Sequence, residues 1–208
     1  MAVAQRRQLT GGHVKRVLLG GLLGGIVMLA WLVVADGILG FKRSIDMNQL
    51  PEERAVYTFL VEHVAEPGRY VCNPEVLPEQ RYPGHDPIFT VQYSGLGHDD
   101  AGQEMILGFV VMLLASIAGA WVLANASSRI LSRYASRVLF LATIGIVLAL
   151  LSVSARFGIS AYPLGDALAL AVHDLAAWVL AGLAVAWVVR PSEAHGPAMG
   201  KQSRSEVM

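Results

Sequence analysis

Four long apolar segments constrain the fold of this chain more than any other feature of its sequence. They occupy residues 17–39, 105–124, 138–155 and 167–189. Each has about the 20 residues that an α-helix needs to cross the hydrocarbon core of a bilayer. A segment in lipid must satisfy its own backbone polar groups, so these segments are expected to be helices. The sequence therefore predicts an all-α membrane protein, a four-helix bundle whose first partner is the lipid bilayer.

The composition agrees with a membrane protein and excludes several other classes. Charged residues make up 15% of the chain, against about a quarter in soluble domains. The net charge is zero, and no basic stretch interleaved with aromatic residues indicates nucleic-acid binding. The single cysteine, Cys72, excludes an intrachain disulfide, and we expect its thiol to be buried beside Tyr70, Val71 and Val76.

The distribution of basic residues predicts the orientation. The basic residues gather in segments 1–16, 125–137 and 190–208, which the sequence therefore predicts to be cytoplasmic. We expect the last of these segments to be a disordered tail. Segment 40–104 carries five basic residues against eleven acidic ones. We therefore expect both termini in the cytoplasm, with 40–104 and the short loop 156–166 outside.

The first apolar segment also has features of a signal peptide. It follows a basic stretch, and Val33-Val34-Ala35 could serve as a small-residue cleavage site. Its apolar run is longer than that of a usual signal peptide, so we expect an uncleaved first span.

Segment 40–104 contains a small α+β insertion between the first and second spans. Leu50-Pro51-Glu52-Glu53 begins a helix that Pro67-Gly68 ends. Residues 69–72 and 87–93 are rich in β-branched and aromatic side chains and predict two short strands. So few apolar residues give a marginal core, so we expect this segment to pack on the outer helix ends or on a partner.

Several short motifs are spread along the chain. They are a tryptophan in the first span, an acidic pair at the outer helix, a Gly-x-Tyr before a proline, a Tyr-Pro pair, and a tryptophan and glycine in the last span. The residues are Trp31, Glu52, Glu53, Gly68, Arg69, Tyr70, Pro74, Tyr162, Pro163, Trp178 and Gly182. On these residues, most of 25–190 resembles small bacterial inner-membrane proteins of no assigned function. The resemblance implies that location and no particular chemistry.

Two ionisable residues, His173 and Asp174, lie inside the fourth apolar segment. Asp174 is about 10 Å deep if the span begins near residue 167. Such groups normally face the bundle and are paired, so we expect an intramembrane polar cluster with Asp36, Arg156 and Asp166. We expect a pair between Arg156 and Asp174. The cluster is a structural clasp, a proton or ion path, or a cofactor site.

Cofactor and metal sites have little support in the sequence. We expect no cofactor, although His173 could hold a haem or a pigment, with His98 as a possible second haem ligand. The pairs His85-Asp86 and His98-Asp99 match no metal-ligand spacing, and we expect a solvated acidic loop. No catalytic set can be assembled, so we expect a protein that is not an enzyme.

Small residues repeat at helix-packing spacing in three spans. Such residues let helix backbones approach closely. They are Gly20, Gly21, Gly24 and Gly25, then Ala115 with Gly119, and Gly182 with Ala186. The double glycine register of the first span offers more small surface than one neighbouring helix requires. It predicts either packing within the same bundle or a partner helix from another protein.

These features predict an accessory or assembly subunit of a larger membrane complex, such as an energy-converting one. It would contact partners through the first span and the acidic outer segment. Two alternatives stay open, a small transporter or proton-conducting protein using His173 and Asp174, and a haem- or pigment-binding subunit using His173.

Overall fold

A computed structural model describes residues 2–73, 85–97, 99–160 and 162–191, with backbone alone at 2–11, 101 and 159. The chain divides into two compact units, one formed by residues 1–45 and 109 onward, the other by residues 46–108. Pro74, His98 and the tail beyond Pro191 lie outside the described residues.

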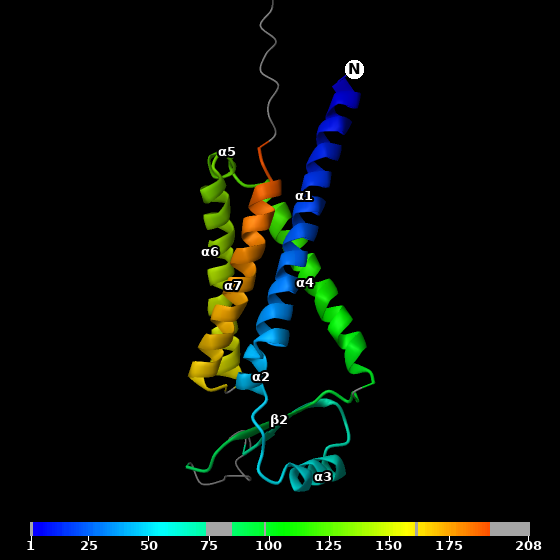
Figure 1. Ribbon diagram of the computed structural model, residues 1–208, viewed down its shortest axis with the longest axis vertical. Helices are drawn as coiled ribbons and strands as arrows, with labels where there is room; N and C mark the ends of the chain where they lie inside the picture. The colour runs from blue at the N-terminus through cyan, green and yellow to red at the C-terminus, as the bar shows by residue number, and fades with distance from the viewer. Residues whose placement is uncertain (1, 74–84, 98, 161, 192–208) are drawn as a thin grey trace, which may run out of the picture. The chain divides into compact units, whose positions relative to one another are not determined.

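The chain is mostly helical, and four of its helices are long and apolar enough to cross a membrane (Figure 1). They make it a candidate multi-pass membrane protein. The four helices are α1 (Ala2–Leu32), α4 (Ala101–Ala124), α6 (Tyr134–Val153) and α7 (Leu164–Val188). A π-helical turn extends two of them: η1 (Val33–Ile38) follows α1, and η3 (Ser154–Ile159) follows α6. Two short helices, α2 (Phe41–Asp46) and α5 (Ser128–Leu131), follow the first and second of these spans.

Helix α1 begins well before the apolar segment that starts at Val17. Its basic first part, expected only as a cytoplasmic segment, is helical from Ala2. The Ala, Gln, Arg, Leu and Lys residues there favour a helix, and no proline interrupts it.

Helix α7 is the centre of the bundle. It packs against α1 on one side and α6 on the other, and lies between them in Figure 1. Seven buried residues form the core toward one end of the bundle: Val17, Ala120, Leu123, Leu141, Val185, Ala186 and Val189.

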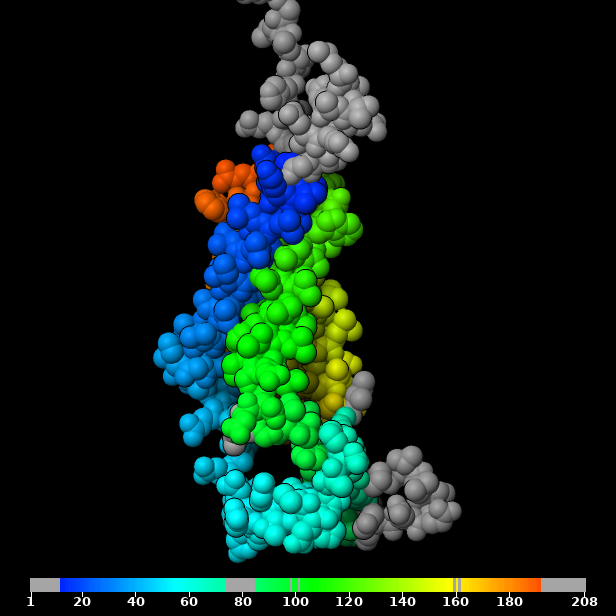
Figure 2. Space-filling model, turned by 90° about the vertical axis from the view of Figure 1, so that its right-hand side faces the viewer, coloured from blue at the N-terminus to red at the C-terminus, as the bar shows by residue number. Residues whose placement is uncertain are grey.

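The four glycines of α1 serve two neighbours in the same chain. A Cβ at Gly20 would meet Val188 and Val189, at the end of α7. Cβ atoms at Gly21 and Gly25 would meet Ile117 and Leu113 of α4, which lies beside α1 in Figure 2.

Gly24 lies between both neighbours, because its Cβ would meet Ser116 of α4 and Val185 of α7. Two helices of the same bundle therefore account for both glycine registers. The glycines therefore give no separate evidence for an outside helix, and a partner helix on α1 stays a prediction.

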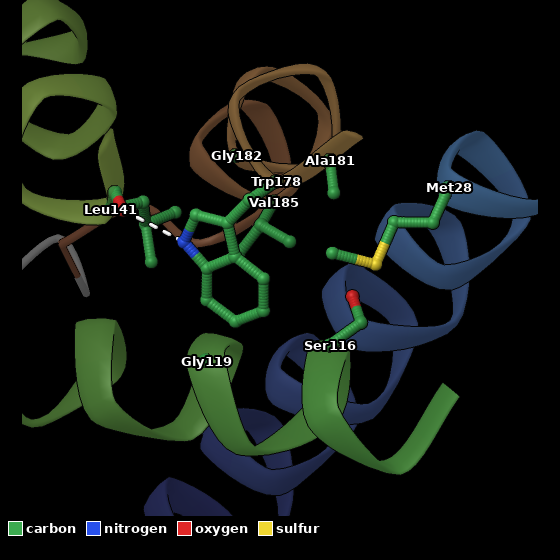
Figure 3. Close-up of a pocket in the computed structure, with 8 residues that line it drawn as sticks. All are labelled: Met28, Ser116, Gly119, Leu141, Trp178, Ala181, Gly182 and Val185. Carbon is green, nitrogen blue, oxygen red and sulfur yellow. Dashed lines mark hydrogen bonds between the residues drawn. The ribbon is translucent and has the colours of Figure 1, made fainter. Parts of the chain in front are cut away.

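The remaining small residues divide between packed and exposed positions. Gly119 lies against the ring of Trp178, and Gly182 lies against Leu141 (Figure 3). The Trp178 indole donates a hydrogen bond from Nε1 to the Leu141 carbonyl oxygen at 2.7 Å. Ala186 is fully buried, whereas Ala115 is exposed. Ala115 lies on the outward face of α4, so close packing of another helix at Ala115 stays a prediction.

The second unit contains one helix and one two-stranded ribbon. Helix α3 (Glu53–His63) precedes strands β1 (Gly68–Cys72) and β2 (Phe89–Tyr93). The strands pair antiparallel with Tyr70 opposite Val91 and Cys72 opposite Phe89. Cys72 is exposed, so the expectation of a buried thiol is wrong. Cys72 ends its strand beside an equally exposed Phe89, and a two-stranded ribbon has no second layer to cover either.

We expect Gly21→Ala to destabilise the bundle, because the new Cβ would lie 2.5 Å from the Ile117 Cα. Overpacking of this kind costs about 1–3 kcal/mol. Thermal unfolding in mild detergent should show a lower midpoint. The control is Gly12→Ala, where nothing lies within 4 Å of the added carbon. An equal midpoint in the two variants would contradict the packing of α1 on α4.

We expect the Cys72 thiol to react with a maleimide in the folded protein, because the side chain is exposed. The chain has one cysteine, so mass spectrometry of the intact protein reports this site alone. The rate in mild detergent should be close to the rate after unfolding in dodecyl sulfate. A strongly slower reaction in the folded protein would show that the thiol is covered.

Candidate functional site

The candidate site is a chain of contacts between ionisable side chains at the η1 and η3 end of the bundle. His173 of α7 is at its centre, with a side chain that is 2% exposed. Its Nε2 lies 3.3 Å from Asp36 Oδ1, and its Nδ1 lies 3.5 Å from Asp174 Oδ1. Arg156 approaches Asp174 Oδ2 at 3.1 Å, and Lys42 approaches Asp36 Oδ2 at 4.0 Å. The sequence of contacts is thus Lys42, Asp36, His173, Asp174 and Arg156.

The structure brings together four of the five residues expected in this cluster. Asp36, Arg156, His173 and Asp174 are joined, and Arg156 pairs with Asp174. No ion pair or hydrogen bond links Asp166 to them among the described residues, so its inclusion is wrong. Asp166 lies in the first turn of α7, where a carboxylate complements the positive end of the helix dipole.

Two members of the cluster lie in π-helical turns. Asp36 lies in η1 and Arg156 lies in η3. A π-helical turn accommodates an extra residue and is frequent at functional sites. It shifts the direction of following side chains relative to an α-helix, so ordinary helical periodicity could not place these two residues.

Sequence reasoning missed three residues around His173. Phe41 stacks on its ring with centroids 5.0 Å apart and an angle of 9°. Trp31 meets the same ring at 5.7 Å and 37°. The third is Lys42, next to Phe41 in α2. The signal that could have found Phe41 and Lys42 is Gly40, whose φ of +67° reverses the chain after η1.

The charges of the cluster balance without His173. Two carboxylates face one guanidinium and one ammonium, so a neutral imidazole leaves the group uncharged. Three atoms reach ion-pair distance without hydrogen-bond geometry, namely Asp36 Oδ1, Arg156 Nη1 and His173 Nε2, which are buried and have no hydrogen-bond partner among the described residues. The buried Trp31 Nε1 also has no hydrogen-bond partner there. Charge attraction and ring stacking, which depend weakly on N–H direction, therefore hold the cluster more than directed hydrogen bonds do.

The surroundings of His173 do not suit a haem or pigment ligand. Both ring nitrogens lie near carboxylate oxygens, and Phe41 covers one ring face. A metal would have to displace Asp36 or Asp174 to reach either nitrogen. Among the described residues, no three His, Cys, Asp or Glu side chains gather to hold a metal. His85 and Asp86 approach at 3.7 Å with the histidine almost fully exposed, which is typical of a solvated pair.

The bundle interior beyond the cluster is apolar and nearly full. One hollow, of about 10 Å³, has space for about one water molecule (Figure 3). Met28, Trp178 and Val185 line it, and its polar member is the buried Ser116 hydroxyl, which has no hydrogen-bond partner among the described residues. The charged cluster therefore ends against a closed interior.

A second polar contact ties α6 to α7 at the opposite end of the bundle. The buried guanidinium of Arg137 donates from Nε to the Ala186 carbonyl oxygen at 3.0 Å, and also donates to the Leu131 carbonyl. The Tyr134 hydroxyl donates to the Leu183 carbonyl oxygen at 3.1 Å. Sequence reasoning used Arg137 only as a loop charge. The contact satisfies a carbonyl near the C-terminus of α7, where a cation is favourable.

Comparison with known proteins gives no relative that could assign a chemistry to this cluster. No protein-family model matches the chain, no curated protein matches it, and no solved structure matches it. The resemblance to small bacterial inner-membrane proteins therefore remains a prediction from the sequence.

We expect Arg156 and Asp174 to stabilise the bundle jointly. In a double-mutant cycle of Arg156→Ala and Asp174→Ala, the coupling energy should be about 1 kcal/mol, within the range of polar contacts between membrane helices. The cycle is measured by chemical unfolding in detergent. The matched control is Lys42→Ala with Asp36→Ala, whose atoms lie 4.0 Å apart and should couple more weakly. Additive losses at Arg156 and Asp174 would contradict the pair.

Proposed function

We propose that this protein is a non-enzymatic, multi-pass membrane protein that acts as an accessory or assembly subunit of a larger complex. The complex we propose is an energy-converting one in the inner membrane of a bacterium. The charged cluster around His173 serves as a clasp that joins α1, α6 and α7. The subunit is held together at this clasp, and its partners bind at its exposed surfaces.

The position of the ionisable residues is the observation that carries the proposal. In α7 none lies between Asp174 and Arg190, and in α6 none lies between Arg137 and Arg156. The stretch free of such groups in α7 is about 22 Å long. Proton transfer needs polar groups or waters at hydrogen-bond spacing, and the hollow in this region has space for about one water. The geometry therefore favours a static role for the cluster.

The exposure of the outer ion pair supports a binding partner. The Arg156 and Asp174 side chains are 29% and 41% exposed, although Arg156 follows a long apolar stretch and Asp174 precedes one. An ion pair open to hydrocarbon is costly. A polar group of a neighbouring subunit, or a lipid headgroup, would complete it.

The proposed orientation places the Arg137 end in the cytoplasm. Arg16 and Arg190 line one pocket near Leu131, so basic residues from three segments gather at this end. Cytoplasmic ends of membrane helices are enriched in such residues. A membrane-impermeant maleimide should then label Cys72 only from the extracytoplasmic side.

A small proton-conducting protein remains the second candidate. The observation in its favour is the unbroken chain of contacts from Lys42 through His173 to Arg156. All of these residues lie at one end of the bundle, so the chain links helices instead of crossing the membrane. A conducting role would need an additional path through another subunit or a second copy.

The test is purification from native membranes in mild detergent, with identification of every associated protein and an absorption spectrum. We expect stoichiometric partners and no visible absorbance from this chain. A colourless protein that purifies alone would contradict the proposal. Asp174→Asn would then be compared with the unchanged chain in a proton-flux assay in vesicles, where loss of flux would establish the second candidate.

A further inference from the structure

The unit formed by residues 46–108 exposes nearly all of its apolar side chains. None of its described residues is buried. Helix α3 has no buried residue, and the strands have only Tyr70 and Val91 half-buried. Exposed contiguous apolar surface of this kind marks an interaction site.

The apolar surface is shaped into a groove between α3 and β2. One wall is a stripe on α3 with the spacing i, i+3, i+4, i+7: Tyr57, Leu60, Val61 and Val64. The other wall comes from β2 and the residues after it, with Val91, Tyr93 and Leu96. The groove has a volume of about 510 Å³, within the range of sites that enclose several side chains or a small ligand.

At one end of the groove, the backbone at Gly95 packs closely against Pro67. Gly95 has a φ of +77°, and a Cβ there would lie 2.5 Å from the Pro67 ring. Chain reversal at Gly95 thus places the segment after β2 against the segment after α3. This contact holds the two walls together with the β1–β2 pairing.

The charge around the groove selects its occupant. Residues 46–108 contain eleven acidic and three basic residues, a net charge of −8. Glu53 lies one turn before Tyr57 on α3, and Asp99 and Asp100 follow the other wall. One basic group is also present, because the Arg54 guanidinium lies 5.9 Å from the Tyr57 ring centroid. Like charge opposes pairing of this unit with a second copy, and it opposes binding to anionic lipid. The complementary surface is apolar with basic residues on either side.

We propose that this groove binds a segment of a partner protein whose apolar side chains are flanked by lysine or arginine residues. The apolar side chains fill the groove, and the basic residues face the acidic ends. The inference rests on the proposed function as a subunit and specifies the chemistry of one of its partners.

The first test is photocrosslinking in native membranes, using the full chain with benzoylphenylalanine in place of Val61. The matched control carries it in place of Phe59, because both residues are on α3 and 60% exposed, but only Val61 lines the groove. We expect the Val61 position to crosslink to a protein segment that mass spectrometry identifies as apolar and basic, and the Phe59 position not to do so. Adducts from Val61 to lipid, to this chain or to an acidic segment would overturn the proposal.

The second test uses defined peptides on the full chain in phosphatidylcholine nanodiscs. A Leu/Phe peptide flanked by lysines should bind at least about tenfold more tightly than its counterpart flanked by glutamates. Val61→Ser should weaken the basic peptide about tenfold, and Phe59→Ser should leave it unchanged. Equal binding of the two peptides, or equal loss in both variants, would overturn the proposal. If native purification yields a partner but Val61 contacts no basic segment, the subunit proposal stands and only the groove assignment fails.

Discussion

The bundle depends on how α7 is fixed at two separate levels along its length. At one level His173 and Asp174 contact charged groups of η1 and η3. At the other level Arg137 donates to the Ala186 carbonyl. Between these levels the Trp178 indole donates to the Leu141 carbonyl oxygen. The other contacts there are apolar or involve glycine, and between membrane helices such contacts give little preference for one helix register over another. The polar contacts therefore select the register, and close packing around the α1 glycines adds the contact area.

The four spans could be predicted from sequence because hydrophobicity over about 20 residues is a local property. Four members of the charged cluster were also within reach, because ionisable residues in apolar segments require partners. Asp166, expected as a further partner just before the fourth apolar segment, has no ion pair with the cluster among the described residues; it lies in the first turn of α7, where the helix dipole stabilises a carboxylate. The sequence therefore identifies the ionisable residues that are candidates for the cluster, and the position of each residue in its helix affects whether it joins.

The remaining parts of the site depend on geometry that periodicity does not encode. The π-helical turns that hold Asp36 and Arg156 break the 3.6-residue repeat. Phe41 reaches His173 only because Gly40 reverses the chain. Cys72 shows the same limit in the outer unit. The apolar neighbours of Cys72 in the sequence suggested that its thiol is buried, but the thiol is exposed. The sequence of a strand does not determine whether a second layer of structure covers it.

The two units differ in what surrounds their exposed apolar side chains. In the membrane that we propose for the bundle, lipid surrounds the spans, so their exposed leucines and valines carry no penalty. Residues 46–108 belong to the segment proposed to lie outside the membrane, and the described part buries none of its side chains. Antiparallel pairing of two strands is marginal in water without a further surface. The apolar groove on α3 and β2 is thus the place where a partner would supply the missing core and stabilise the unit as it binds.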